Sequence, residues 1–306
     1  MSLYSRLFSK KVVAGVEIGG QTAAVAISSE LGKFIWKKKG IPTRVPIKPS
    51  EAIESITNAI KESKYDIESI GIASFGPLDL IHGKMGNTPK PLWGGFPLVE
   101  EMQKNFPGIP IILETDVNAP AYSEYLEFSK INPEIKSLAY VTIGTGVGLG
   151  LYSDGKPYHG TMHPEFGHAF PRRIPNDTYI GNCPFHKDCF EGMISALALG
   201  SRLNVAPSDI RYVKNDDPIW DTFTKYVAQM VSDAAMAYSL DVFVLGGGIA
   251  TAKGREFIFD KIQHETSKII NNYIKVPLVS PPHNGQDSGL VGACALALHH
   301  DIFKRK

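Results

Sequence analysis

Residues 12–20 read Val12-Val13-Ala14-Gly15-Val16-Glu17-Ile18-Gly19-Gly20, an apolar run that ends in two glycines. A short apolar run that is rich in β-branched residues and bounded by glycine predicts a buried strand. The segment 23–27 is apolar again, so we expect it to pair back on the first strand through the Gly19-Gly20 turn. The chain is therefore predicted to open with a strand, a tight turn and a second strand.

The same pattern occurs a second time near the middle of the chain. Residues 138–142 are strand-like and run into Gly144-Thr145-Gly146, and residues 149–152 are expected to pair back after that turn. Further strands are expected at 67–73, 109–113 and 242–245. Helices are expected at 50–60, 220–238 and 288–298, and another helix is expected to follow the strand 109–113 and to end at about residue 128. Two halves that begin alike and continue in alternation predict two similar α/β domains around a cleft.

The composition narrows the class of protein. The chain has 306 residues, of which 43% are hydrophobic, enough for two ordinary globular domains. The formal net charge is +1 and the opening apolar run is interrupted at Glu17, so we expect no nucleic-acid partner, no membrane partner and no signal peptide. Three cysteines do not make a disulfide framework, and a reducing, cytoplasmic location is expected.

A metal site is predicted from the spacing Cys183-x2-His186-x2-Cys189. A tight loop with this spacing can turn two thiolates and one imidazole toward one point, and these ligands suit Zn2+. His168, upstream, could supply the fourth ligand of a closed tetrahedral site, which would make the zinc structural rather than catalytic. The alternative is a surface loop that carries two unrelated cysteines.

Two carboxylates lie beside this segment in the sequence. Glu165 precedes His168 by three residues and Glu191 follows Cys189 by two. If a metal holds both segments, the two carboxylates come together and can accept hydrogen bonds from a polyol. The alternative, solvated loop carboxylates, stays open on spacing alone.

Three glycine turns follow predicted strands, at Gly19-Gly20, Gly144-Thr145-Gly146 and Gly246-Gly247-Gly248. Glycine lets the backbone approach a phosphate and point its N–H groups at it. None of the turns has the Walker A pattern or the pattern of a dinucleotide site. Three such turns in two similar halves predict a nucleotide bound between the domains.

These residues together resemble the ROK family of sugar kinases, and within it the zinc-containing fructokinase subgroup. The pair of motifs most specific to that subgroup is His163-Pro164-Glu165-Phe166-Gly167-His168 and Cys183-Pro184-Phe185-His186-Lys187-Asp188-Cys189. The matching stretches run in family order over nearly the whole chain: residues 15–20, 74–77, 87–90, 115–119, 143–148, 163–168, 181–192 and 245–248.

The resemblance implies an actin-like, hexokinase-type (ribonuclease H-like) fold. The smaller N-terminal domain would span residues 1–118, and the larger C-terminal domain, residues 119–293, would carry the zinc loop and the nucleotide site. A C-terminal helix at about 294–306 would pack back on the first domain. The implied activity is ATP-dependent phosphorylation of D-fructose to D-fructose 6-phosphate by a homodimer.

The resemblance also implies roles for individual residues. Asp116 would be the general base, and the sugar would be held by Asn118, Glu165 and Glu191, with Thr88 and Pro89 closing over it. We expect the nucleotide at the three turns, and Mg2+ held through water by Glu17. The implied nucleotide-binding residues are Gly19, Gly20, Thr145, Gly146, Gly246, Gly247 and Gly248, and the implied zinc ligands are His168, Cys183, His186 and Cys189.

The chain departs from the family pattern in two places. The first phosphate turn usually reads Gly-Gly-Thr-Lys, whereas here Gln21 and Thr22 follow the glycines, so Mg2+ or another basic residue must replace the missing lysine. After Glu191-Gly192 the family usually has Ser-Gly-Pro-Ala, whereas this chain has Ser195-Ala196-Leu197-Ala198. We expect Leu197 to narrow the nucleotide pocket and to alter the choice of donor.

Two other functions remain open. One is a mannokinase or glucokinase of the same family, although glucokinases typically carry a Cys-x-Cys-x4-Cys zinc motif in place of the spacing found here. The other is a catalytically degenerate sugar sensor. The first strand begins at about residue 12, which leaves no room for the helix-turn-helix of ROK repressors. Retention of Asp116 favours an enzyme.

Overall fold

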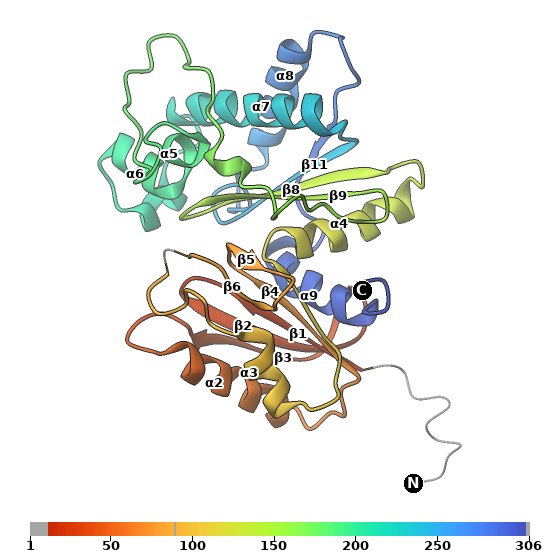
Figure 1. Cartoon of the computed structure of the whole chain (residues 1–306). Coiled ribbons are helices and arrows are strands. Elements are labelled where there is room, and N and C mark those ends of the chain that lie inside the picture. The colour runs from red at the N-terminus through yellow and green to blue at the C-terminus, as the bar shows by residue number, and fades with distance from the viewer. Residues whose placement is uncertain (1–11, 89, 304–306) are drawn as a thin grey trace. The chain divides into compact units, whose positions relative to one another are not determined.

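The computed structural model describes residues 12–88 and 90–303. The described chain divides into two compact units, each a five-stranded sheet with helices packed on it (Figure 1). The first unit comprises the residues up to Ser123 together with His159–His163 and the residues from Asp287 onward. The second comprises Glu124–Tyr158 and Pro164–Gln286.

The sheet of the first unit has the strand order β3-β2-β1-β4-β7. Its strands are β1 (Val13–Ile18), β2 (Thr22–Glu30), β3 (Lys33–Pro42), β4 (Ser69–Ser74) and β7 (Ile111–Thr115). The predicted opening hairpin is confirmed, because β1 and β2 pair antiparallel up to Ile18 and Ala23, at the two sides of the glycine turn. β1 pairs parallel with β4, and β4 pairs parallel with β7.

The two faces of this sheet are covered by different helices. Ala14, Val16 and Ile18 of β1 belong to a core shared with α2 (Pro49–Glu62) and α3 (Leu98–Asn105). On the other face, Ala24 and Ala26 of β2 pack against α9 (Ser288–Leu298). The alternation of side chains along β1 therefore leaves Gly15 and Glu17 on the side of α9.

The helix α9 lies unusually close to the sheet. A Cβ atom placed on Gly15 would lie 2.4 Å from Sγ of Cys294, and one placed on Gly71 would lie 1.9 Å from the carbonyl oxygen of Ala293. Each position therefore excludes any side chain larger than hydrogen. Because α9 is built mainly from small residues and is almost completely buried, its backbone packs directly on β1 and β4.

The second unit repeats the arrangement, with the strand order β10-β9-β8-β11-β12. The strands are β8 (Ser137–Ile143), β9 (Val147–Ser153), β10 (Lys156–Pro157), β11 (Val242–Gly246) and β12 (Leu278–Ser280). As in the first unit, an antiparallel hairpin is followed by parallel strands. The similarity predicted from the two glycine turns is thus present in the sheets themselves.

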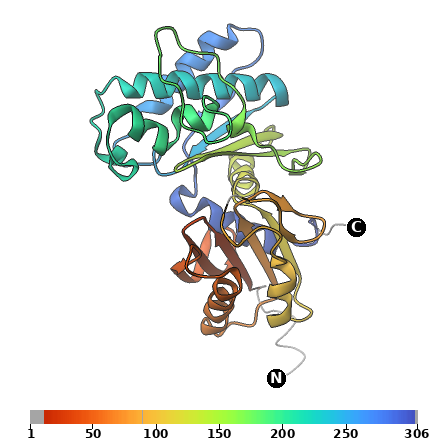
Figure 2. The ribbon, with the colours of Figure 1, turned by 60° about the vertical axis from the view of Figure 1, so that its left-hand side comes forward.

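One face of the second sheet is covered by a layer of helices, which Figure 2 shows from the side. These helices are α5 (Phe190–Ile194), α6 (Ala196–Leu203), α7 (Ile219–Tyr238) and α8 (Phe257–Ile270). The predicted long helix is α7, whose Trp220, Phe223 and Tyr226 are completely buried. On the other face, Tyr125 of α4 (Asn118–Ile131) stacks on Tyr152 of β9, with 4.1 Å between the ring centroids.

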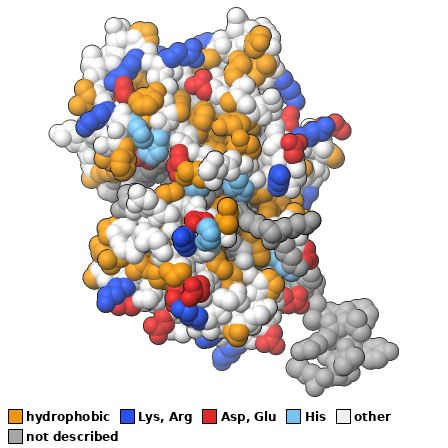
Figure 3. Space-filling model, in the orientation of Figure 1, with side chains coloured by type: hydrophobic (Ala, Val, Ile, Leu, Met, Phe, Trp, Pro, Cys, Tyr) orange, Lys and Arg blue, Asp and Glu red, His pale blue; other side chains and the backbone are white. Residues whose placement is uncertain are grey.

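Charges are mixed on the surface. On the face drawn in Figure 3, basic and acidic side chains are interspersed without a large field of one sign, as the net charge of +1 leads one to expect. Within the described part of the chain, no helix combines the length and the apolar character that crossing a membrane requires.

The contact between α9 and β4 gives a test of the fold. Gly71→Ala places a methyl group where the backbone of Ala293 already lies, so we expect the free energy of unfolding to fall by about 3 kcal/mol or more. Gly94→Ala is a matched control, because the nearest atom to its added Cβ would lie 3.9 Å away. Urea denaturation of both variants measures the difference; equal stability would contradict the packing described for α9.

Candidate active site

The carboxyl ends of three parallel strands meet at one edge of the first sheet. Ile18 of β1 pairs with Ser74 of β4, and Ser74 pairs with Thr115 of β7. The hydrogen bonds continue one residue further, because the Asp116 amide donates to the Ser74 carbonyl at 2.8 Å. Asp116 and the Gly19-Gly20 turn therefore lie at the same edge, which is where ligands bind in open α/β sheets.

The first glycine turn is held by Thr43, the residue that follows β3. Gly19 closes the turn by donating its amide to the Thr22 carbonyl at 3.0 Å. The Thr43 hydroxyl donates to the Gly19 carbonyl at 2.8 Å, and the Thr43 amide donates to the Gln21 carbonyl at 3.1 Å. Trp93, which is buried, donates its indole N–H to the Thr43 carbonyl. The turn thus has a fixed backbone on which a ligand can be positioned.

Asn118 is oriented by a buried carboxylate. Its side chain is fully buried, and Nδ2 donates to Oε1 of Glu114 at 3.3 Å. The other oxygen of Glu114 lies 2.8 Å from Nε2 of His159. Nε2 of His159 also lies 3.3 Å from Nδ2 of Asn118, so the three side chains form one cluster of polar contacts. Glu114, which no motif in the sequence marks, therefore positions both of its neighbours.

The carboxyl group of Glu17 has a strongly raised pKa. Burial, and then the charge of Asp116, raise the pKa of Glu17 to about 7 from an ordinary value of 4.5, although Lys39 acts in the opposite direction. The side chain faces the first turn of α9, because a Cβ placed on Gly289 would lie 2.4 Å from Oε1 of Glu17. Two carboxyl groups at one sheet edge form a site that a divalent cation would stabilise.

The segment expected to close over the sugar is described only in part. The Thr88 hydroxyl accepts a hydrogen bond from the Lys90 amide at 3.3 Å, and the Thr88 amide donates to the Gly86 carbonyl. Pro89 lies outside the described residues.

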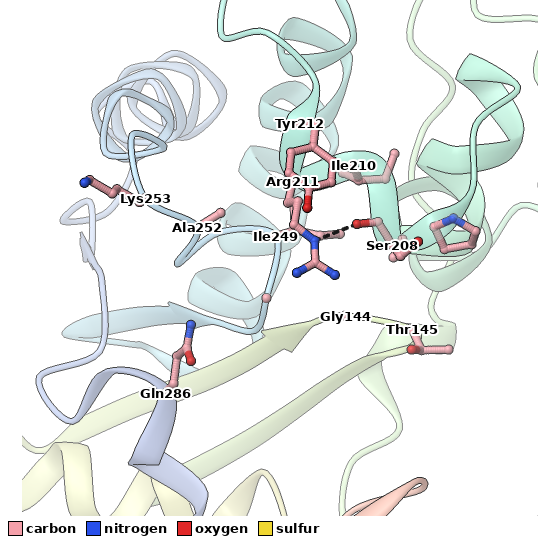
Figure 4. Close-up of a pocket in the computed structure, with 13 residues that line it drawn as sticks. Gly144, Thr145, Ser208, Ile210, Arg211, Tyr212, Ile249, Ala252, Lys253 and Gln286 are labelled. Atoms are coloured by element: carbon pink, nitrogen blue, oxygen red, sulfur yellow. Dashed lines mark hydrogen bonds between the residues drawn. The ribbon is translucent and has the colours of Figure 1, made fainter.

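The second unit contains a cavity of ≈ 510 Å3 at the other two glycine turns (Figure 4). This volume lies in the range of small-molecule sites. Gly144 and Thr145 line it from the turn between β8 and β9, and Gly248 lines it from the turn after β11. Gly247 has φ = +86°, and a Cβ there would lie 2.3 Å from the Ile143 carbonyl oxygen, so this turn requires glycine.

Several residues of the cavity wall were not predicted. The short 3-10 helix Pro207–Tyr212 forms one side, and Arg211 extends from it into the cavity (Figure 4). Lys253 and Gln286 line the cavity from other segments. Ala196 also lines it, whereas Leu197 is not among the lining residues and is 45% exposed. The expectation that Leu197 narrows this pocket is therefore wrong.

The two predicted carboxylates occupy different surroundings. Glu191, on α5, accepts a hydrogen bond from the Val147 amide at 3.1 Å, and its carboxylate lies against Gly146. It is thus bound to the glycine turn between β8 and β9. Glu165 is exposed and immediately precedes the 3-10 helix Phe166–His168.

The structure brings the four predicted metal ligands together. The ligand atoms of His168, Cys183, His186 and Cys189 all lie within 4.8 Å of one another. Nδ1 of His168 is 3.3 Å from Nδ1 of His186, 3.7 Å from Sγ of Cys183 and 3.6 Å from Sγ of Cys189. Tetrahedral zinc would separate two nitrogens by about 3.3 Å, and a nitrogen from a sulfur by about 3.6 Å. The quartet therefore fits a closed zinc site.

The chain between His168 and Cys183 is fixed by a partly buried ion pair. Arg202 binds both carboxylate oxygens of Asp177, at 2.9 and 2.8 Å, and the Tyr226 hydroxyl donates to the same carboxylate at 2.6 Å. Burial alone would raise the pKa of Asp177, but these hydrogen bonds lower it to about 2. The segment is thus attached to α6 and α7 independently of any metal.

Comparisons with known proteins agree with this architecture. A model of the ROK family matches residues 13–300. A fructokinase of Pediococcus pentosaceus is 32% identical over 295 residues, which cover 94% of this chain and 97% of that protein.

Solved structures show the same fold. The ROK hexokinase of Thermus thermophilus superimposes with a TM-score of 0.76 at 22% identity, over 95% of this chain and 99% of that one. The ROK family glucokinase of Streptomyces griseus, solved with glucose and AMPPNP, gives 0.75 at 23% identity, over 94% and 99%. The predicted actin-like, hexokinase-type fold is confirmed.

The pKa of Glu17 predicts a pH-dependent stability. Because its folded-state pKa lies above its ordinary value, the folded protein binds the proton more tightly than the unfolded one. Its contribution to stability is present below about pH 4.5 and is lost as the pH rises through 7. Relative to wild type, Glu17→Gln should therefore gain on the order of 3 kcal/mol in free energy of unfolding between pH 5 and pH 8.

Urea denaturation without added magnesium measures this gain. The exposed Glu54→Gln variant serves as the control. A difference between Glu17→Gln and wild type that stays constant over the pH range would rule out the perturbed carboxyl group.

Proposed function

The chain belongs to the ROK family, and on that premise we propose that it transfers the γ-phosphoryl group of ATP to D-fructose, forming D-fructose 6-phosphate. The fructokinase of Pediococcus pentosaceus, similar over nearly its whole length, supports fructose as the acceptor. The Streptomyces griseus glucokinase, solved with a sugar and an ATP analogue, supports the same two classes of ligand.

One observation carries the proposal: Asp116, Glu17 and the Gly19-Gly20 turn lie at the edge where the carboxyl ends of β1, β4 and β7 meet. This edge combines a carboxylate that can act as a base, a second carboxyl group that can bind a cation, and a turn that can approach a phosphate. Phosphoryl transfer depends mainly on positioning and charge stabilisation, and these groups supply both.

In the proposed reaction, the Asp116 carboxylate accepts the proton of the fructose 6-hydroxyl. The deprotonated hydroxyl oxygen forms a bond to the γ-phosphorus, while the bond between that phosphorus and the ADP oxygen breaks. Asn118, oriented by Glu114, would hold a neighbouring sugar hydroxyl. The segment with Thr88 and Pro89, and the carboxylates of Glu165 and Glu191, would complete the sugar site.

The cavity of the second unit would take the nucleotide. Two glycine turns have backbones that can approach phosphate groups. They contain the nucleotide-binding residues Thr145, Gly146, Gly246, Gly247 and Gly248. Support comes from the composition of the wall, because Arg211 and Lys253 line the cavity and no Asp or Glu is among its lining residues. A wall of this charge favours a polyanion such as ATP.

Two metals fit the residues. Glu17 would bind Mg2+ through a water molecule, and Mg2+ would neutralise phosphate charge. A structural Zn2+ would be bound by His168, Cys183, His186 and Cys189. Such a site supports assignment of the chain to the zinc-containing fructokinase subgroup. Since Glu165 precedes this quartet and Glu191 follows it, the zinc would fix both carboxylates relative to one another.

Asp116→Asn tests the catalytic base. The variant keeps the shape of the side chain but cannot accept the proton, so we expect kcat to fall by about 10²–10⁴ while the Kd for fructose stays nearly unchanged. The exposed Asp154→Asn variant is the matched control. A coupled assay and calorimetry provide the measurements, and near-normal turnover of Asp116→Asn would remove this assignment.

Metal analysis tests the zinc site. Wild-type protein should contain about one zinc ion per chain, whereas Cys189→Ala should lose it and unfold at a temperature several degrees lower, because structural zinc contributes directly to folding. Cys294→Ala is the control for zinc content, since Cys294 is buried in α9 of the other unit. Retention of stoichiometric zinc by Cys189→Ala would contradict the quartet.

A coupled assay of the zinc-replete protein with MgATP against fructose, mannose and glucose tests the function itself. Turnover on fructose well above the other two is the expected result. Better turnover on mannose or glucose would keep the kinase and replace the substrate. Sugar binding without turnover on any of the three would contradict the proposal and favour a sensor.

A further inference from the structure

The side chain of Lys90 lies directly on the first glycine turn. A Cβ placed on Gly20 would lie 2.3 Å from Nζ of Lys90 and 2.9 Å from its Cε. A side chain at position 20 would therefore displace the Lys90 ammonium group from the turn. The absence of a side chain on Gly20 thus allows the ammonium group to lie against the backbone of the turn.

This ammonium group has no acidic partner among the described residues. It makes a cation–π contact with the face of Phe75, whose ring centroid lies 5.7 Å from Nζ. Phe75 is buried and packs edge-on against Trp93, with 5.4 Å between the ring centroids. An aromatic face attracts a cation but leaves its N–H donors available. Lys90 is therefore placed at the turn with donors that an anion can use.

A second cation is attached to the next residue of the turn. Arg44 is exposed, and its Nη1 donates to Oε1 of Gln21 at 2.7 Å. Arg44 follows Thr43, the residue that clamps the turn, so its backbone is fixed relative to the glycines. Two cations thus flank a turn whose own sequence, Gly19-Gly20-Gln21-Thr22, contains none.

The carboxylates at the same edge explain why a cation is needed here. Besides burial, the negative charge of Asp116 disfavours ionisation of Glu17. A transferring phosphoryl group would add negative charge to an edge that already holds these two groups. Fixed cations aimed at such a group lower the barrier, because they stabilise the charge that it carries in the transition state.

We infer that Lys90, assisted by Arg44, binds the transferring phosphoryl group at the Gly19-Gly20 turn and supplies the charge that the turn itself lacks. The inference rests on the proposed kinase activity and makes Lys90 a further catalytic residue. Its ammonium group donates hydrogen bonds to a non-bridging phosphoryl oxygen and keeps its protons throughout. The proton of the sugar hydroxyl goes to Asp116, as described above.

Lys90→Met tests the charge with little change in side-chain length. We expect kcat for MgATP and fructose to fall roughly 100-fold, as for removal of a preorganised transition-state donor, while the KM for fructose stays within about threefold. Lys90→Arg should retain part of the activity because it keeps the charge. Lys38→Met is the control, since Lys38 is exposed on β3 and pairs with Glu62.

A second variant separates a missing charge from a damaged fold. Thr22 is exposed at the end of the turn, so a lysine there can supply an ammonium group to the turn. Adding Thr22→Lys to Lys90→Met should recover at least about tenfold of the lost kcat, a result that structural damage would not give. Arg44→Gln should cost less than Lys90→Met because Arg44 lies at the solvent-exposed side.

Binding of inorganic tripolyphosphate gives a readout that does not depend on turnover. Calorimetry should show an affinity about tenfold weaker for Lys90→Met than for wild type, and unchanged for Lys38→Met. Equal affinity in all three proteins would overturn the inference.

The kinetic outcomes distinguish the inference from the function on which it rests. Active wild type with an unchanged kcat for Lys90→Met would overturn the inference alone. A raised KM for fructose with unchanged kcat would also overturn it, because Lys90 would then belong to the sugar site. Wild-type protein that transfers no phosphate to any sugar would instead contradict the proposed function.

Discussion

The close packing of α9 on β1 and β4 is the constraint on which the first unit depends. The backbone of the helix reaches the sheet only because Gly15 and Gly71 carry no side chain there. The same contact places the first turn of α9 against Glu17 and so buries its carboxyl group. A packing requirement thus produces a chemical property, since burial is the largest cause of the raised pKa of Glu17.

The arrangement of the candidate site follows from the parallel pairing of β1, β4 and β7. Parallel strands end at a common edge, so residues distant in sequence, Gly19, Phe75 and Asp116, follow their strands at neighbouring positions, and Glu17 is the second-last residue of β1. The acidic groups come from β1 and the end of β7, whereas the cations Arg44 and Lys90 come from the segments that follow β3 and β6 (Lys84–Met85). The turn between them has a fixed backbone, and this combination of opposite charges suits the binding of a phosphate together with a divalent cation.

The sequence predicted the elements whose residues are periodic or bounded by glycine, such as the opening hairpin and α7. It did not predict β3, because its exposed lysines give an edge strand little apolar signal. The metal quartet was predictable from spacing, since three of its ligands lie in one short loop. Contacts between distant segments were not: Lys90 against Gly20, or the wall that Pro207–Tyr212 builds, depends on packing that no local pattern records. The error at Leu197 has the same origin, because only the direction of α6 decides which of its residues faces the cavity.

The central claim is that this chain transfers phosphate from ATP to the primary hydroxyl of a hexose. It is tested most directly by nuclear magnetic resonance of the product formed from MgATP and uniformly 13C-labelled fructose. The account predicts a single new phosphate resonance that is coupled to carbon 6 of the sugar, formed together with ADP. A phosphate coupled to carbon 1, or ADP formed with no sugar phosphate, would contradict it.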